Sequence, residues 1–165
     1  MTRLIYLSTF WTVLLDIMAW FIIHVAVVLV AVRIPQSYFR SDKFLYRTRT
    51  WEEDGSFYQA VFSIKKWKDL APDGAEWVKN RGFPKRKLKN RNVGYLRTFL
   101  RETCRAELAH WIIMFFAPFF FLWNKPYVGW IMIFYAAAEN LPLIMIQRYN
   151  RARLRRVIKR KRDPS

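Results

Sequence analysis

Residues 101–111 hold the side chains whose types and spacing are best suited to acid–base chemistry. Glu107 and His110 stand three residues apart, so on a helix both lie on one face and within reach of each other. Arg105 precedes them, and an apolar run begins at Leu108. A carboxylate, an imidazole and an arginine at the start of a membrane span are what acid–base chemistry on a lipid would need. The alternative is that Arg105 and His110 are interfacial anchors and Glu107 is an ordinary helical residue.

The composition indicates a small membrane protein with a basic face. Hydrophobic residues make up 53% of the 165 residues and are gathered in long blocks, with most of the net charge of +17 outside those blocks. Basic residues that flank bilayer-length apolar runs suit anionic headgroups or a phosphate-bearing substrate better than nucleic acid, so no nucleic-acid partner is expected. The single cysteine excludes an internal disulfide.

Three apolar runs predict an all-α integral membrane protein that forms a single membrane domain over residues 1–165. The first run, residues 9–32, is long enough to cross a bilayer as one transmembrane helix. Residues 108–123 and 127–146 predict a C-terminal transmembrane helical hairpin around the turn Asn124-Lys125-Pro126. A hairpin that enters the bilayer without crossing it is an open alternative.

Two basic segments flank these runs. In residues 33–106 we expect interfacial amphipathic helices, because one stretch places apolar side chains at helical spacing, namely Phe57, Val61, Ile64 and Trp67. Residues 147–165 form a polybasic tail. Of the 29 lysines and arginines, 18 lie in the central segment and nine in the tail. The positive-inside rule therefore predicts a multi-pass protein of the cell membrane with the central segment and C-terminus in the cytoplasm.

Two ionisable residues inside the apolar runs are expected to meet. With a rise of about 1.5 Å per residue, His24 lies roughly 22 Å from the outer end of the first run, and Glu139 about 18 Å from the outer end of the third. A charged group at such a depth is costly unless it is paired. The similar depths predict a structural contact between His24 and Glu139 rather than a catalytic one.

A second group of polar residues is expected at the cytoplasmic mouth of the hairpin. Asn140 and Gln147 are seven residues apart and share one face of the third run. Arg148 lies at the level of His110 on the neighbouring helix. The sequence therefore predicts one membrane-level pocket that opens to the cytoplasm and is lined by Glu107, His110, Asn140, Gln147 and Arg148.

Other kinds of site have no signature in the sequence. It contains no paired cysteines or His-x-x-x-His spacing for a metal, no Gly-rich phosphate loop and no Gly-x-Ser-x-Gly elbow, so no metal and no cofactor are expected. The His-x-x-x-x-Asp signature of many glycerolipid acyltransferases is absent, since Phe115 occupies the acidic position. Cys104 lies six residues from His110 and off its face, which favours a structural role over a thioester nucleophile.

Several short motifs resemble one known family in their order and spacing, over nearly the whole chain. They are Arg33-Ile34-Pro35 with Tyr38-Phe39, Lys66-Trp67-Lys68 followed by Asp73-Gly74, Glu102-Thr103 with Arg105-Ala106-Glu107-Leu108 and His110-Trp111, Ile133-Phe134-Tyr135-Ala136, and Asn140, Pro142, Ile144, Gln147-Arg148-Tyr149-Asn150-Arg151 and Arg153-Leu154. The chain thus resembles the glycosyl-4,4'-diaponeurosporenoate acyltransferases of staphyloxanthin-type carotenoid biosynthesis. Four residues are outside the pattern, which argues against essential roles for them: Asp16, His24, Cys104 and Glu139.

The resemblance implies a membrane enzyme that transfers a fatty acyl group to the glucose 6-hydroxyl of a glycosylated carotenoid acid or a related glycolipid. Acyl-CoA is the expected donor and co-substrate, because a basic cytoplasmic face suits its phosphates. The expected partners are therefore membrane lipids, the glycolipid acceptor and the acyl donor. The alternative is a non-catalytic membrane module that binds anionic lipid and partner proteins, and it needs no polar cluster at the hairpin mouth.

The resemblance supplies no catalytic residues, so their roles are assigned from the residues themselves. His110 is expected to take the proton from the sugar hydroxyl, with Glu107 orienting the imidazole. Arg105 or Arg148 is expected to stabilise the oxyanion or to hold donor phosphate. Asn140 and Gln147 complete the expected substrate-binding group.

Overall fold

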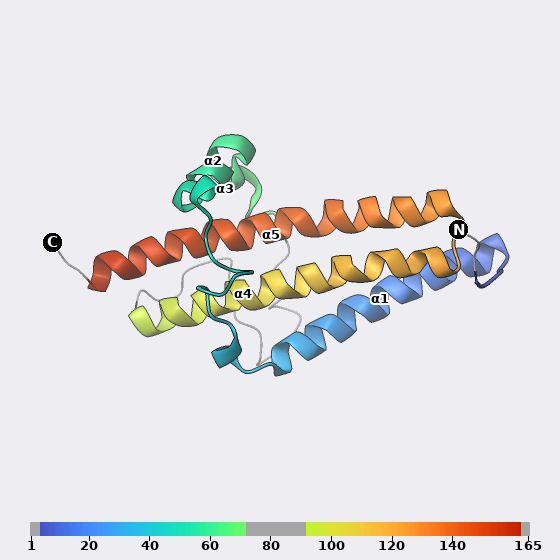
Figure 1. The fold of residues 1–165 in the computed structure, drawn as a ribbon, viewed down its shortest axis with the longest axis horizontal. Helices are drawn as coiled ribbons and strands as arrows, with labels where there is room; N and C mark the ends of the chain where they lie inside the picture. Colours follow the sequence, from blue (N-terminus) through green and yellow to red (C-terminus); the bar gives the residue numbers. More distant parts are fainter. Residues whose placement is uncertain (1–3, 72–91, 163–165) are drawn as a thin grey trace. The chain divides into compact units, whose positions relative to one another are not determined.

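The computed structural model describes residues 4–71 and 92–162, and these ranges contain helices, turns and bends but no strand (Figure 1). In chain order the elements are α1 (Thr9–Arg33), η1 (Gln36–Tyr38), η2 (Thr50–Gly55), α2 (Ser56–Phe62), α3 (Ile64–Trp67), α4 (Val93–Phe116), η4 (Ala117–Leu122) and α5 (Pro126–Arg162). The predicted all-α class is confirmed. The Asp73-Gly74 pair lies outside the described residues.

Three stretches are helical, long and apolar enough to cross a membrane, as the sequence predicted: Thr9–Arg33, Val93–Leu122 and Pro126–Arg162. The first matches the predicted bounds to within one residue. The second and third are longer than the apolar runs from which they were predicted. Helix α5 passes through Pro142 and continues into the polybasic tail, whose alanine, leucine, lysine and arginine residues favour helix.

Contacts along the backbone divide the chain into two compact units. The first unit consists of Met1–Arg33 and Leu108–Pro142, and the second of Ile34–Glu107 and Leu143–Ser165. The expectation of a single membrane domain stays a prediction.

Trp20 lies at the centre of the first unit. Its indole stacks on Phe120 with a centroid separation of 4.6 Å and meets the ring of Tyr135 edge-on at 5.5 Å. The indole Nε1–H lies 3.4 Å from the sulfur of Met132, so the polar edge of the ring also has a partner. Apolar side chains of α1, α4, η4 and α5 complete this core, among them Val27, Ile113, Ala117 and Ala136.

The connection between η4 and α5 is tied to α1 by Asp16. Its Oδ1 accepts hydrogen bonds from Trp123 Nε1 at 2.7 Å and from Asn124 Nδ2 at 2.6 Å. The buried carboxylate therefore has two donors and serves a structural purpose. At the start of α5, a Cβ on Gly129 would lie 2.5 Å from the ring of Phe121, so only glycine fits there.

The predicted contact between His24 and Glu139 is confirmed. His24 Nε2 lies 3.4 Å from Glu139 Oε1. The other ring nitrogen, Nδ1, lies 2.8 Å from the carbonyl oxygen of Trp20. A carbonyl oxygen only accepts, so Nδ1 carries the hydrogen, and Nε2 faces the carboxyl group of Glu139.

Replacing His24 and Glu139 together by leucine should leave the expected enzymatic activity within a few-fold of the parent rate, because neither group is then left unpaired in the membrane. Each single replacement should lower the amount of folded protein more than the double replacement does. Both quantities can be measured in isolated membranes, by product formation and by quantitative immunoblotting. Complete inactivation of the double variant at parental protein levels would mean that the pair takes part in the reaction.

The short helices α2 and α3 pack against α5 inside the second unit. Tyr58 and Ile64 are buried against Ile146 and Tyr149. The expected single amphipathic helix is interrupted, because Ser63 adopts a left-handed conformation with φ 49°. Of the four apolar residues at helical spacing, Ile64 is buried in the protein and Val61 is exposed.

Two close contacts hold other parts of the second unit to α5. Gly55 has φ 92°, and a Cβ there would lie 3.1 Å from the Cβ of Ala152, so both its conformation and the available space favour glycine. The first turns of α4 pack on the C-terminal half of α5 through Leu96, Phe99 and Leu154. These contacts bring residues of α4, α5 and the segment 34–55 together.

Candidate active site

The imidazole of His110 is held by Asn140 within the first unit. His110 Nδ1 lies 2.9 Å from Asn140 Oδ1. Asn140 Nδ2 donates to the carbonyl oxygen of Ala136 at 2.9 Å, so the amide orientation is fixed and Oδ1 is the acceptor. Nδ1 of His110 therefore carries the hydrogen, and in the neutral ring the lone pair is on Nε2.

This arrangement is what a general base requires. The imidazole is half-buried and its tautomer is set by a side chain that is 1% exposed. A base whose second nitrogen donates to a fixed acceptor is oriented for proton transfer at the first nitrogen. Asn140, predicted to bind substrate, is thus the hydrogen-bond partner of the predicted base.

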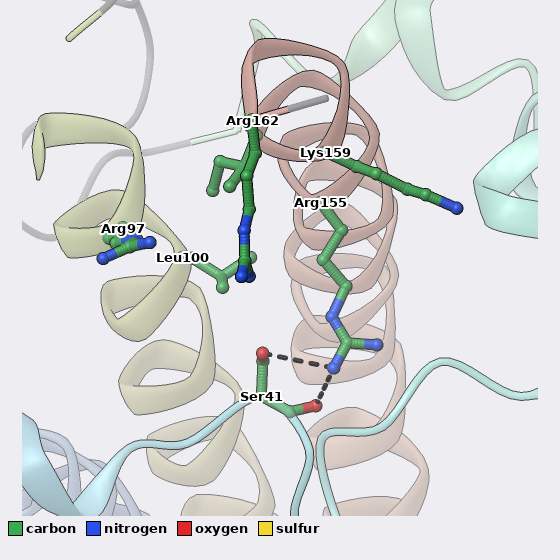
Figure 2. A pocket seen from close by; sticks show the side chains of 7 residues that line it. Ser41, Arg97, Leu100, Arg155, Lys159 and Arg162 are labelled. Carbon is green, nitrogen blue, oxygen red and sulfur yellow. Dashed lines mark hydrogen bonds between the residues drawn. The ribbon is translucent and has the colours of Figure 1, made fainter. Parts of the chain in front are cut away.

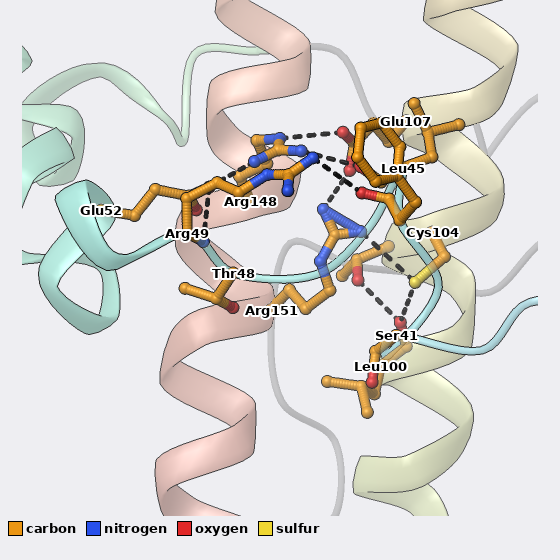
Figure 3. A network of polar contacts seen from close by, with 12 residues as sticks. Ser41, Leu45, Thr48, Arg49, Glu52, Leu100, Cys104, Glu107, Arg148 and Arg151 are labelled. Atoms are coloured by element: carbon orange, nitrogen blue, oxygen red, sulfur yellow. Dashed lines mark hydrogen bonds and ion pairs between the residues drawn. The ribbon is translucent and has the colours of Figure 1, made fainter.

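Glu107 and Arg148 form a buried ion pair of the second unit (Figure 3). Arg148 Nε donates to Glu107 Oε1 at 2.9 Å, and the glutamate is fully buried. Arg148 also donates to Glu52 and, at 2.8 Å, to the carbonyl oxygen of Leu45. Each of its three nitrogens has an acceptor within the protein, which favours a structural role for this arginine.

Sequence reasoning missed Arg151, which is among the most buried charged residues of the second unit. Arg151 donates to Glu107 Oε2 and, at 3.3 Å, to the sulfur of Cys104, and its guanidinium lies over the ring of Tyr46. The residue spacing on the two helices contains a signal for this contact. Cys104 and Glu107 are three residues apart on α4, and Arg148 and Arg151 are three apart on α5, so two complementary pairs share one face of each helix.

Two tyrosines beside this network remain protonated at neutral pH. Burial, and secondarily the nearby Cys104 and Glu107, raises the pKa of Tyr46 to about 12. Burial, and secondarily the carboxylate of Glu52, raises the pKa of Tyr58 to about 12. Neither phenol is therefore a candidate for proton abstraction.

Arg105 is also used within the second unit. It donates to Glu102 at 2.6 Å and to the carbonyl oxygen of Ile34 at 2.9 Å, and its guanidinium lies over the ring of Phe39. Gln36 donates to the same Glu102 oxygen at 3.1 Å. Arg105 thus ties α4 to the segment that comes directly after α1.

Four buried side-chain atoms have no hydrogen-bond partner among the described residues, two of them in the His24–Glu139 pair and two in residues of the second unit that could receive a ligand. The latter two are the Nε–H of Arg105, a donor, and Oε1 of Gln147, an acceptor. Both residues were predicted to bind substrate. A buried polar group without a partner is costly, so such atoms are candidates for contacts with a bound molecule.

The structure brings Glu107 together with Arg148, and His110 together with Asn140. The single pocket expected to join all five candidate residues stays a prediction. Within residues 4–71 and 92–162 no group of three or more His, Cys, Asp or Glu residues could hold a metal ion.

Comparison with known proteins gives one consistent match. The model of the family described as glycosyl-4,4'-diaponeurosporenoate acyltransferase matches residues 42–160. A curated protein of that name from Staphylococcus aureus strain Newman is 36% identical over 148 residues, covering 87% of this chain and 88% of the relative. Its counterpart from strain MRSA252 is 35% identical over 143 residues, covering 86% of this chain and 85% of the relative. No solved structure matches the chain.

Proposed function

Because the chain belongs to the glycosyl-4,4'-diaponeurosporenoate acyltransferase family and is an acyltransferase, we propose that it transfers a fatty acyl group from acyl-CoA to the sugar 6-hydroxyl of a glycosylated carotenoid acid or a related glycolipid. The three helices able to span a membrane suit an acceptor with an apolar tail. The charge asymmetry supports a location in the cell membrane with the central segment and C-terminus in the cytoplasm, where acyl-CoA is found.

The observation that carries the proposed mechanism is the chain of hydrogen bonds from His110 through Asn140 to the Ala136 carbonyl. It supports His110 Nε2 as the atom that takes the proton from the sugar hydroxyl. The sugar oxygen attacks the thioester carbonyl, its new bond to carbon forms, and the carbon–sulfur bond breaks. The imidazolium then returns the proton to the departing thiolate, which leaves as free CoA.

In this proposal Arg105 and Gln147 keep the ligand-binding roles expected of them, and Glu107 and Arg148 receive revised ones. Oε1 of Gln147 is assigned as an acceptor and Nε of Arg105 as a donor for a molecule bound to the second unit, since each lacks a partner among the described residues. Glu107 and Arg148 hold the fold of the second unit, because their charged atoms are engaged with each other and with Glu52 and Arg151. The orienting role expected of Glu107 is assigned to Asn140.

The proposed reaction can be tested in a host that makes the glycosylated carotenoid acid but no acylated product. Adding this chain should produce a carotenoid heavier by one fatty acid less one water, and mild alkali should release the fatty acid. Lipid extracts analysed by liquid chromatography and mass spectrometry provide the readout. Normal amounts of the protein in the membrane with no acylated glycolipid would contradict the proposal.

Asn140→Leu should lower acyl transfer by about tenfold, since the Nδ1–H of His110 loses its acceptor and the tautomer is no longer fixed. Asn140→Asp keeps an acceptor oxygen and should retain more activity than Asn140→Leu. The rate at saturating acyl-CoA is the quantity to compare, with the thermal midpoint of each variant as control. Equal rates for the parent and Asn140→Leu would remove Asn140 from the mechanism.

A further inference from the structure

A second charged region of the second unit is not explained by the proposed mechanism. Helices α4 and α5 and the residue Ser41 border a groove of about 530 Å³ (Figure 2). This basic groove is lined by Ser41, Arg97, Leu100, Arg155, Ile158, Lys159 and Arg162. Four of these seven residues are cationic and none is acidic.

The cations of the basic groove differ from the buried arginines described above, which are engaged by carboxylates. Arg97, Lys159 and Arg162 are exposed and form no ion pair with any acidic residue in the described part of the chain. In Figure 2 the side chain of Arg162 extends between α4 and α5, beside Leu100. The carboxylate of Asp42 interacts electrostatically with Arg155 but pairs with Arg40. The three exposed cations are gathered without an ion-pair partner among the described residues, which is unfavourable and favours an anionic ligand.

Arg155 supplies the fixed part of the groove. It donates through Nη2 to the carbonyl oxygen of Ser41 at 2.7 Å and to its hydroxyl at 3.2 Å, and through Nη1 to Thr48 at 3.3 Å. These bonds hold both the guanidinium and the chain at Ser41 in place. Arg155 therefore contributes a positive charge at a fixed position in the groove, while its terminal nitrogens donate to Ser41 and Thr48.

We propose that the basic groove binds the phosphate groups of the acyl donor, a soluble nucleotide thioester of the coenzyme A class. This inference rests on the proposed function. The volume is within the range of small-molecule sites, and Leu100 with Ile158 offers apolar surface beside the cations. An anionic lipid headgroup carries the same phosphate chemistry, but a donor thioester is what the proposed reaction consumes.

The test compares two double variants that each remove two positive charges. R97Q/R162Q removes charges from the basic groove, and R101Q/R160Q removes exposed charges from the same two helices outside it. Full-length protein is reconstituted in nanodiscs of zwitterionic lipid, with and without phosphatidylglycerol. Binding of coenzyme A is measured by titration calorimetry without any acceptor, and the KM for acyl-CoA is measured in the acyl-transfer assay.

R97Q/R162Q should weaken coenzyme A binding about tenfold and raise the KM for acyl-CoA by a similar factor with little change in kcat, because two charge-assisted contacts are lost at an exposed site. R101Q/R160Q should behave like the parent. Binding to the parent should weaken as salt is added. Equal affinity of both double variants for coenzyme A would overturn the inference.

Two further outcomes matter. One distinguishes a lipid headgroup from coenzyme A as the ligand, and the other distinguishes failure of the proposed function from failure of the groove assignment. Retention of phosphatidylglycerol that depends on Arg97 and Arg162, without binding of coenzyme A, would identify a lipid site and overturn the donor assignment. Coenzyme A binding that is lost in R97Q/R162Q would support the groove even if no acceptor were acylated. In that case the proposed function would fail while the groove assignment stood.

Discussion

Replacing His110 by alanine is expected to lower the rate of acyl transfer by about 10²–10⁴-fold, the usual effect of removing a general base. The reason is that Asn140 fixes the ring so that Nε2 holds the lone pair, and alanine has no group that can take the hydroxyl proton. The rate should be measured with purified protein at saturating acyl-CoA. His24 offers a matched histidine control, since its contact with Glu139 is structural in this account.

The His110→Ala variant should otherwise resemble the parent. Coenzyme A binding and the thermal midpoint should change little, because His110 is half-buried and does not line the basic groove. Cys104→Ser should leave the rate nearly unchanged, as the buried thiol contacts Arg151 and the carbonyl oxygen of Leu100. A His110→Ala enzyme that turned over at the parent rate would exclude the imidazole as base.

Glu107→Gln is expected to destabilise the protein by about 3–5 kcal/mol, the usual cost of removing one partner from a buried ion pair. Glu107 is fully buried and accepts hydrogen bonds from both Arg148 and Arg151. When the charge of Glu107 is removed, Arg151 retains only its contacts with the sulfur of Cys104 and the ring of Tyr46, and neither is a counter-charge.

Thermal unfolding in detergent measures this loss, which should lower the midpoint by on the order of 10 °C. Asp42→Asn is the matched control, because Asp42 pairs with Arg40 on the surface, where both side chains are mostly exposed. Screening by water makes such a pair contribute little, so the control should unfold with the parent. A Glu107→Gln midpoint equal to that of the control would show that the buried network adds no stability. Any loss of activity in Glu107→Gln should follow the amount of folded protein, in contrast to His110→Ala.

The spans could be predicted because their signal is local. An unbroken apolar run followed by Arg33 and Pro35 defines α1, and the predicted and observed ends agree to within one residue. The length of α5 could not be read in the same way. The apolar run stops at residue 146, whereas intrinsic helix preference and packing on α4 continue the helix to Arg162.

The site could be predicted only where helix geometry decides it. Equal depth was enough to pair His24 with Glu139. The choice of acceptor for His110 depends on side-chain orientation across 30 residues of sequence, which periodicity does not contain. The arginine contacts join residues that are even farther apart in the sequence. Arg148 meets Glu52 across 96 residues, and Arg155 meets Ser41 across 114. Such pairings arise from tertiary packing, so residues expected to bind substrate became structural ones.

Acyl transfer from a thioester to a sugar hydroxyl can be tested directly in a single reaction. Purified protein in nanodiscs is mixed with acyl-CoA and a glycosylated carotenoid acid, and free CoA thiol and acylated product are measured in the same samples. We expect equal amounts of thiol and ester, and neither above background when the acceptor is omitted or His110 is alanine. Ester formed at the expense of membrane phospholipid, with no release of thiol, would contradict it.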